Sequence, residues 1–179
     1  GQLSCLSRLI DELHLLSLAD AGQLSLEKVQ CCPSDILRER LLWIKPQLDE
    51  AGIRAVSDMA ESKTLCADPF RLGQVFTILL ENALRYAGSS TTLSLSTRST
   101  AGHYEITVQD SGPGVPQAFL EVMFERFARG DASRARHSGG SGLGLSIAQA
   151  ICHAHDGTIE ATLPAEGGLR MRIVLPDTA

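Results

Sequence analysis

The sequence predicts an α+β two-layer sandwich, in which one mixed β-sheet is covered by helices on one face. Segments 92–98 and 103–109 alternate polar and apolar residues, as an antiparallel pair of strands does. Other segments carry apolar residues at helical spacing, and no strand–helix–strand unit repeats. With 179 residues, 44% of them hydrophobic and 21% charged, the chain has the composition of one globular domain with a possible appendage.

Residues 2–20 are expected to form an amphipathic helix, because their leucines and one isoleucine recur three and four apart. Ala21-Gly22 ends it. The sequence has no second helix of this kind to cover the apolar stripe, which indicates half of a helical bundle. We therefore assign residues 1–22 to the second helix of a separate domain and residues 23–33 to a linker, with an edge strand over 24–29.

Residues 34–179 are predicted to form the main domain. Asp68-Pro69 is a good helix start, with Asp68 as the N-cap and proline in the first turn. We expect helices over 34–51 (bent near Pro46), 69–86, 116–124 and 143–155, and strands over 53–59, 64–67, 92–98, 103–109, 158–163 and 169–175.

The charge distribution favours a small anionic ligand. The net charge of -5 argues against general nucleic-acid binding. Residues 126–137 nevertheless carry four arginines against one aspartate, a local charge of +3. The alternative is a solvated basic loop. No uncharged apolar run approaches the roughly 18 residues that span a bilayer.

The cysteines and histidines indicate no metal site. Five cysteines without a C-x-x-C pair are typical of reduced thiols in a cytosol-like compartment, without a disulfide framework. His153 and His155 lie two apart, on different sides of a helix. We expect structural or surface roles for all five histidines.

Asp110 is the first candidate site residue. It falls in phase with the apolar face of its strand, and a carboxylate there needs a hydrogen-bonding partner. Gly112 and Gly114 follow it and allow the backbone to approach a ligand closely. The alternative is that Asp110 only caps the turn through its own backbone.

A glycine-rich segment, 139–145, opens directly into a predicted helix. Backbone N–H groups at such a helix start can hold phosphate. The segment is not a P-loop, because no lysine follows its glycines, and the last spacing of G-x-G-x-x-G is one residue short.

Asn82 lies on the helix over 69–86, on the same face as Ile78, Arg85 and Tyr86. Its amide oxygen suits Mg²⁺, which takes few protein ligands beside phosphates and water. The alternatives are a surface amide for Asn82 and an i,i+4 ion pair with Glu81 for Arg85.

These elements together, in this order, resemble the four boxes of the ATP-binding catalytic domain of sensor histidine kinases, in the GHKL superfamily with gyrase, Hsp90 and MutL. The amino-acid sequence around residues 13–15 and 139–145 resembles that of the Bae-type envelope-stress sensors. The resemblance implies the Bergerat ATP-binding fold for the main domain, and the dimerisation and phosphoacceptor domain for the first helix. The matching boxes are residues 82–86 (N), 110–114 (G1), 124–127 (F) and 140–145 (G2).

The resemblance implies a role for each matching residue. Asp110 would accept from the adenine amino group in a pocket shaped by Gly112 and Gly114, and Asn82 would ligate Mg²⁺. Arg85 and Tyr86 would contact phosphate and ribose or adenine. Arg129, with Arg134 less favoured, would reach the γ-phosphate from a mobile lid over 126–141. The remaining binding residues implied by the F and G2 boxes are Phe127, Gly140, Gly142, Leu143, Gly144 and Leu145.

Two departures from the family pattern matter. Ile78 stands where ATP-hydrolysing relatives carry a glutamate base, and Glu81 is expected to turn about 100° away around the helix. The phosphoacceptor pattern His-Glu/Asp-x-x-x-Pro is absent, and Leu15-Leu16-Ser17 follows His14 instead. We therefore expect a nucleotide site without its own histidine nucleophile.

The leading hypothesis is thus a histidine kinase catalytic domain that uses ATP and Mg²⁺. Its expected partners are its own phosphoacceptor domain, as a homodimer in the full-length protein, and a response regulator. We expect a cytoplasmic domain of a bacterial inner-membrane protein, attached through a more N-terminal region. The alternatives are a GHKL ATPase clamp, a degenerate nucleotide-binding module and an anti-sigma-factor serine kinase.

Overall fold

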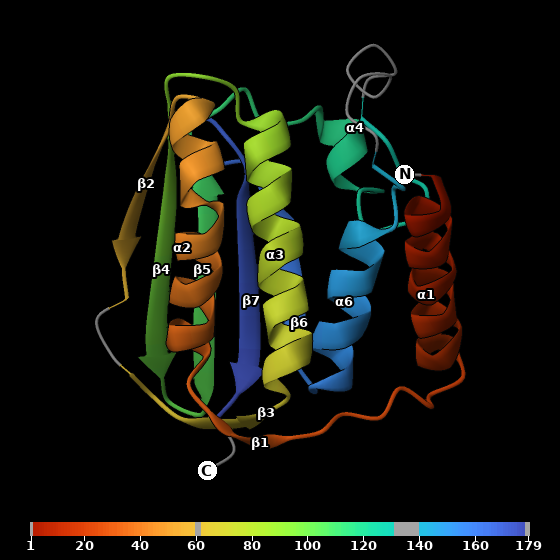
Figure 1. Ribbon diagram of the computed structural model, residues 1–179. Helices are drawn as coiled ribbons and strands as arrows, with labels where there is room; N and C mark the ends of the chain where they lie inside the picture. Colours follow the sequence, from red (N-terminus) through yellow and green to blue (C-terminus); the bar gives the residue numbers. More distant parts are fainter. Residues whose placement is uncertain (1, 60–61, 131–139, 178–179) are drawn as a thin grey trace.

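The computed structural model describes residues 2–59, 62–130 and 140–177 (Figure 1). Its main sheet has five strands in the order β2-β4-β5-β7-β6. Only the pair β2–β4 is parallel, and the other three pairs are antiparallel, so the predicted mixed sheet is confirmed. The strands are β2 (Ile53–Asp58), β4 (Thr91–Thr100), β5 (His103–Asp110), β7 (Arg170–Pro176) and β6 (Thr158–Thr162).

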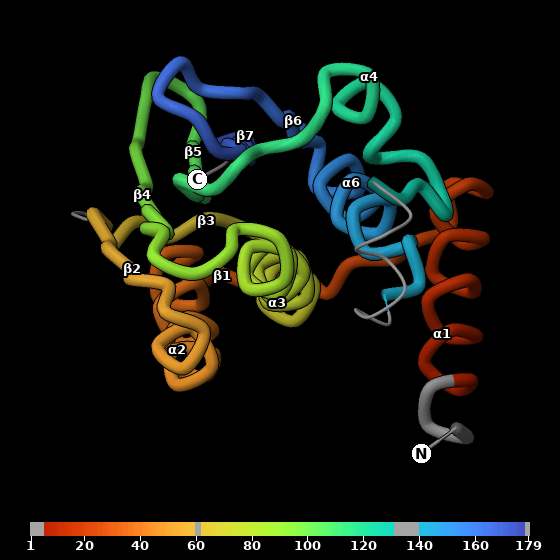
Figure 2. The backbone as a smooth tube through the Cα atoms, turned by 90° about the horizontal axis from the view of Figure 1, so that it is seen from above, coloured from red at the N-terminus to blue at the C-terminus, as the bar shows by residue number. Residues whose placement is uncertain are grey.

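Three helices cover one face of this sheet, as predicted: α2 (Pro33–Glu50), α3 (Pro69–Tyr86) and α6 (Gly144–Ala154) (Figure 1). Helix α1 (Gln2–Asp20) lies beside α6, on the side away from α3 (Figures 1 and 2). The predicted N-cap of α3 is present, since the Asp68 side chain accepts the Arg71 N–H at 3.0 Å.

Two short elements differ from the sequence prediction. The edge strand expected over 24–29 is wrong, because the strand is β1 (Val29–Cys31), which pairs with β3 (Leu65–Ala67) in a separate two-stranded sheet. Before it, the Glu27 N–H donates to Asp68 Oδ2 at 2.9 Å. In the segment expected to be helical over 116–124, only α4 (Gln117–Leu120) is an α-helix.

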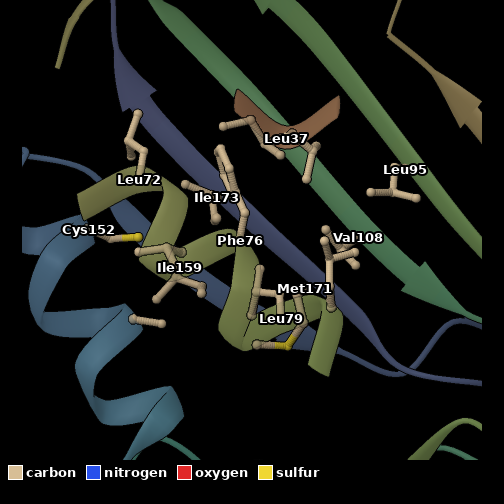
Figure 3. Packing of buried hydrophobic residues seen from close by; sticks show 14 of the residues in the cluster. Leu37, Leu72, Phe76, Leu79, Leu95, Val108, Cys152, Ile159, Met171 and Ile173 are labelled. Carbon is tan, nitrogen blue, oxygen red and sulfur yellow. The ribbon is translucent and has the colours of Figure 1, made fainter. Parts of the chain in front are cut away.

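The core lies between the sheet and its helices. Leu72, Phe76 and Leu79 of α3 face Met171 and Ile173 of β7 (Figure 3). All five side chains are buried, and burial of each large apolar side chain contributes about 1.5–3 kcal/mol. This packing places the last two turns of α3 and the end of β5 side by side.

A buried histidine joins the helix α3 to the helix α6. His155, which is 3% exposed, accepts the Asp68 N–H at Nε2 (3.0 Å), and its Nδ1–H donates to the Ile151 carbonyl (2.8 Å). Burial is the main cause that lowers the pKa of His155, and Lys28 acts in the same direction. The hydrogen bond to Ile151 and the carboxylates of Asp68 and Asp156 oppose this shift.

We expect the free energy of unfolding to decrease as the pH falls from about 7 to about 5, because the unfolded imidazole takes up a proton that the folded site excludes. Each such proton contributes at most about 1.4 kcal/mol per pH unit. Urea unfolding at several pH values measures this slope. His155→Gln should reduce it, whereas His153→Gln, at an exposed position on the same helix, should leave it unchanged. Equal slopes in both variants would contradict the assignment.

Candidate functional site

A cavity of about 250 Å³ opens between α3, the start of α6 and the end of β5. Leu93, Val108 and Met171, from three neighbouring strands, contribute apolar lining. The cavity also brings together most of the sequence-predicted site residues: Asn82, Arg85, Tyr86, Asp110, Gly114, Arg129, Gly140, Gly142, Gly144 and Leu145.

Asp110 ends β5 and lines this cavity with a half-buried carboxylate. Its Oδ1 accepts the Gly112 N–H at 2.8 Å, so Asp110 does cap the turn, as the alternative interpretation expected. The backbone N–H groups of Leu169 and of Asp110 itself also stabilise the charged carboxylate. Burial raises the pKa of Asp110 above its ordinary value, although the Gly112 hydrogen bond works against this shift. Asp110 therefore both holds the turn and offers an acceptor to the cavity.

The face of α3 predicted from helical spacing does line the cavity, with Ile78, Asn82, Arg85 and Tyr86. Asn82 is half-buried, while Arg85 and Tyr86 are exposed. The guanidinium of Arg85 lies against Gly140, where a Cβ atom would overlap its Nη1. The ion pairs found among the described residues do not include one between Glu81 and Arg85.

Two glycines permit the close approach of α3, α6 and the segment around Phe127. Gly142 has φ +75°, and a Cβ there would lie 2.9 Å from Phe127 Cα. A Cβ on Gly144 would lie 3.3 Å from Ile78 Cγ2. Side chains at these positions would push the neighbouring segments apart, so the glycines allow this close packing beside the cavity.

The start of α6 suits an anionic group. Its N-cap residue, Leu143, makes no side-chain capping hydrogen bond, and the Leu143 N–H donates to Ser141 Oγ at 3.2 Å. The first N–H groups of a helix have no partner within the helix and carry its partial positive charge. Phosphate oxygens are a good match for such a site.

Three predicted residues do not line the cavity: Gly112, Phe127 and Leu143. Gly112 lies behind Asp110, where a Cβ would overlap the Ala87 carbonyl oxygen. The Leu143 side chain is buried in the core. Phe127 has φ +61° and a largely exposed ring, and its N–H donates to the Gly142 carbonyl at 2.9 Å. These three residues therefore border the cavity without lining it.

Arg129 lines the cavity and is exposed, and its Nη2–H donates to the Gly140 carbonyl at 2.8 Å. It therefore lies next to the glycine segment, where a phosphate could replace this carbonyl as its partner. The predicted lid, residues 126–141, includes residues 131–139. These residues, Arg134 and Arg136 among them, lie outside the described part of the chain.

Sequence reasoning missed several residues of the cavity. Glu81 is among the residues that line it. Arg8 and Glu12 of α1 also line it, as does Leu169 before β7. The Gly167-Gly168 pair before β7 is the sequence signal for a tight turn there, and spacing along α1 gives no signal for its contact with α6.

Four of the five cysteines lie where their thiols can be described. Cys31, Cys32, Cys66 and Cys152 are free thiols. The described residues contain no group of three or more His, Cys, Asp or Glu side chains that could hold a metal ion. Among the helices described here, none is long and apolar enough to cross a membrane.

Comparison with known proteins agrees with this geometry. A family model described as "Histidine kinase-, DNA gyrase B-, and HSP90-like ATPase" matches residues 67–179, and the chain belongs to this family of ATP-binding domains. Within it, the chain is a catalytic domain of the sensor histidine kinase class, to which its curated relatives belong. The expected α+β ATP-binding fold and the family resemblance are thereby confirmed.

Two curated relatives illustrate the match. The chain is 37% identical over 176 residues to the signal transduction histidine-protein kinase BaeS of Escherichia coli K12, covering 98% of this chain and 38% of BaeS. It is 36% identical to the probable sensor histidine kinase TcrY of Mycobacterium tuberculosis, covering 86% of this chain and 32% of TcrY. The chain thus spans less than two fifths of either relative.

Solved structures share the fold. The histidine kinase AdeS of Acinetobacter baumannii superposes with a TM-score of 0.82 at 25% identity, over 99% of this chain and 81% of AdeS. Full-length ShkA, crystallised in complex with AMPPNP, superposes with a TM-score of 0.83 at 23% identity, over 97% of this chain and 36% of ShkA. The ShkA comparison supports the fold alone.

Proposed function

We propose that this chain binds Mg-ATP in the cavity between α3 and α6 and transfers the γ-phosphate to a histidine on a separate phosphoacceptor domain. The observation that carries the proposal is the juxtaposition of the Asp110 carboxylate, the polar face of α3 and the uncapped start of α6 around one cavity. An acceptor at one end and an anion site at the other match the two ends of a nucleoside triphosphate.

The adenine end is assigned to Asp110. Its Oδ1 accepts the Gly112 N–H, and the half-buried carboxylate lines the cavity, where it would accept a further hydrogen bond from the adenine amino group. Guanine carries a carbonyl at that position and would present an acceptor to an acceptor. A site built on such a hydrogen bond discriminates by up to about 10⁴-fold, so ATP should be strongly preferred to GTP.

The phosphate end is assigned to the start of α6, with Gly140, Gly142 and Gly144 around it. Arg85 and Arg129 both lie against Gly140 and bring two positive charges to this end of the cavity. Positioning and charge neutralisation are most of what phosphoryl transfer requires of a protein. These residues would hold the phosphates and orient the terminal one.

The residues present fit one magnesium ion. Asn82, which is half-buried in the cavity wall, offers a neutral amide oxygen. Magnesium is commonly held by one or two protein ligands together with phosphates and water. When bound, it would neutralise part of the charge of the phosphates, and Asn82 would fix its place relative to α3.

A second candidate function is ATP hydrolysis by the chain itself. The observation that favours it is that Glu81, the nearest carboxylate to Asn82 in sequence, lines the cavity. Ile78, which packs against the start of α6, has no group that could activate water. Steady hydrolysis that is lost in Glu81→Gln would support this function, and its absence would leave transfer to histidine as the reaction.

The proposed partners follow from the class of the relatives. We infer a phosphoacceptor domain that includes α1 as its second helix, a homodimer of the whole sensor kinase, and a response regulator that receives the phosphate. A cytoplasmic position in a bacterial inner-membrane protein is part of the same proposal. The sensor kinases BaeS and TcrY, each more than twice the length matched here, support it.

Incubation with γ-labelled ATP tests the function. We expect little label on the chain alone and acid-labile label on a separately supplied phosphoacceptor domain, increasing with its concentration because no tether raises the effective concentration. Asn82→Ala should reduce transfer about 100-fold, since metal-site residues commonly cost that much. Gln74→Ala, on the same helix outside this cavity, is the matched control. Label on the isolated chain that His14→Ala removes would contradict the proposal.

A further inference from the structure

Helix α1 reaches the cavity with two charged side chains, Arg8 and Glu12. Ser141 Oγ–H donates to Glu12 Oε2 at 2.9 Å, and Arg8 Nε lies 3.6 Å from Glu12 Oε1. The Glu12 side chain is 18% exposed, against 64% for Arg8. The carboxylate is therefore the better enclosed member of this pair, and it lies at the glycine segment before α6.

Ser141 connects this carboxylate to the proposed phosphate site. It lies between Gly140 and Gly142, and its Oγ accepts the Leu143 N–H at 3.2 Å. One hydroxyl thus joins Glu12 to the backbone from which α6 begins. A carboxylate at this place adds negative charge beside a site that suits anions, and little solvent separates the two because Glu12 is largely covered.

Helix α1 is attached to the rest of the chain by its own side chains and is not part of the main sheet. Leu15 and Leu16 are buried in the core, and Asp20 forms an ion pair with Arg126 at 2.5 Å between exposed groups. Exposed ion pairs of this kind contribute little to stability. Residues 23–28, which connect α1 to β1, form neither helix nor strand. Separation of α1 from α6 would expose Leu15 and Leu16 but would break no strand pairing of the main sheet.

We propose that α1, in the position seen here, inhibits nucleotide binding: Glu12 competes with the terminal phosphates of ATP for the segment before α6. This inference rests on the proposed nucleotide site. Because coupling between two binding events is reciprocal, nucleotide binding weakens the docking of α1 by the same factor. A partner that withdraws α1 from α6 would in turn raise the affinity for ATP. If Glu12 were instead a ligand of magnesium, it would strengthen the binding of Mg-ATP.

Calorimetry on the whole chain tests the inference, with Mg-ATP, Mg-ADP and adenosine as probes. Glu12→Gln removes the charge and keeps an oxygen that can accept from Ser141. We expect this variant to bind ATP about tenfold more tightly, within the usual range of coupling between sites. The gain should be smaller for ADP and absent for adenosine, which has no phosphate. Asp11→Asn, which removes the neighbouring charge outside the nucleotide cavity, should change nothing.

Each outcome decides a point. ATP binding by the parent chain with no gain in Glu12→Gln would overturn the inference and leave the nucleotide site intact. Weaker, magnesium-dependent binding in the variant would overturn it in favour of a metal ligand. Failure of both proteins to bind any adenine compound would overturn the proposed function and the inference together.

Amide hydrogen exchange supplies a second readout. Residues 12–20 of α1 should exchange faster in the parent chain when Mg-ATP is bound, and adenosine should have no such effect. Unchanged exchange at saturating Mg-ATP would overturn the inference, because the two occupants would then be present together without opposing one another.

Discussion

Replacing Asp110 by asparagine is expected to weaken ATP binding by about 100-fold while the fold stays intact. The asparagine oxygen can still accept the Gly112 N–H and hold the turn. Its NH₂ group then faces the adenine amino group, so a charge-assisted hydrogen bond is replaced by two opposed donors. The loss of a partly buried charge, whose pKa burial raises, removes a desolvation cost and should not destabilise the protein.

Calorimetric titration with Mg-ATP measures the effect of Asp110→Asn, and urea unfolding confirms that the variant is folded. Asp58→Asn makes the same chemical change at an exposed position on the edge strand β2 and should bind like the parent chain. If Asp110→Asn binds ATP as tightly as the parent chain does, the adenine assignment is wrong.

Gly168→Ala is expected to destabilise the protein by about 3 kcal/mol or more, a loss typical of a strained backbone combined with a steric clash. Gly168 has φ +84°, and a Cβ atom on it would overlap the carbonyl oxygen of Asp110. Backbone meets backbone here, so no flexible side chain can move aside. The turn before β7 would have to separate from the end of β5, which would also displace Asp110.

Gly167→Ala is the matched control for this loss. Gly167 has φ +95°, but its Cβ would have only the Gly112 carbonyl oxygen nearby, at 3.8 Å. It should therefore cost about 1 kcal/mol, from backbone strain alone. The difference between the two variants in urea unfolding isolates the clash. Equal losses would show that the turn does not pack against Asp110 as described.

The sequence predicts best those elements whose determinants are local. Helix α3 carries its N-cap, its proline and its apolar stripe within its own residues, and it begins at Pro69 and ends at Tyr86 as expected. The hairpin of β4 and β5 is likewise encoded by alternation around Gly102. By contrast, the pairing of β1 with β3 depends on two three-residue segments meeting across the fold, and no local pattern fixes it.

The same division holds for the candidate site. Asn82 and Asp110 could be proposed from helix phase, strand phase and the order of the glycine-rich boxes. Glu12 and Gly168 could not, because each acts on a residue far along the chain, Ser141 for the first and Asp110 for the second.

The position of β5 between β4 and β7 has a consequence for how the site assembles during folding. β4 joins β5 through a short turn and can pair with it early, whereas Gln109 meets Arg170 of β7 across 61 residues of chain. Closing so long a loop costs entropy before any contact repays it, so this pairing should form late. Leu169 and Met171 reach the cavity only with it. A partly folded chain would therefore lack the part of the cavity wall that Leu169 and Met171 form. ATP would then stabilise only the completed fold.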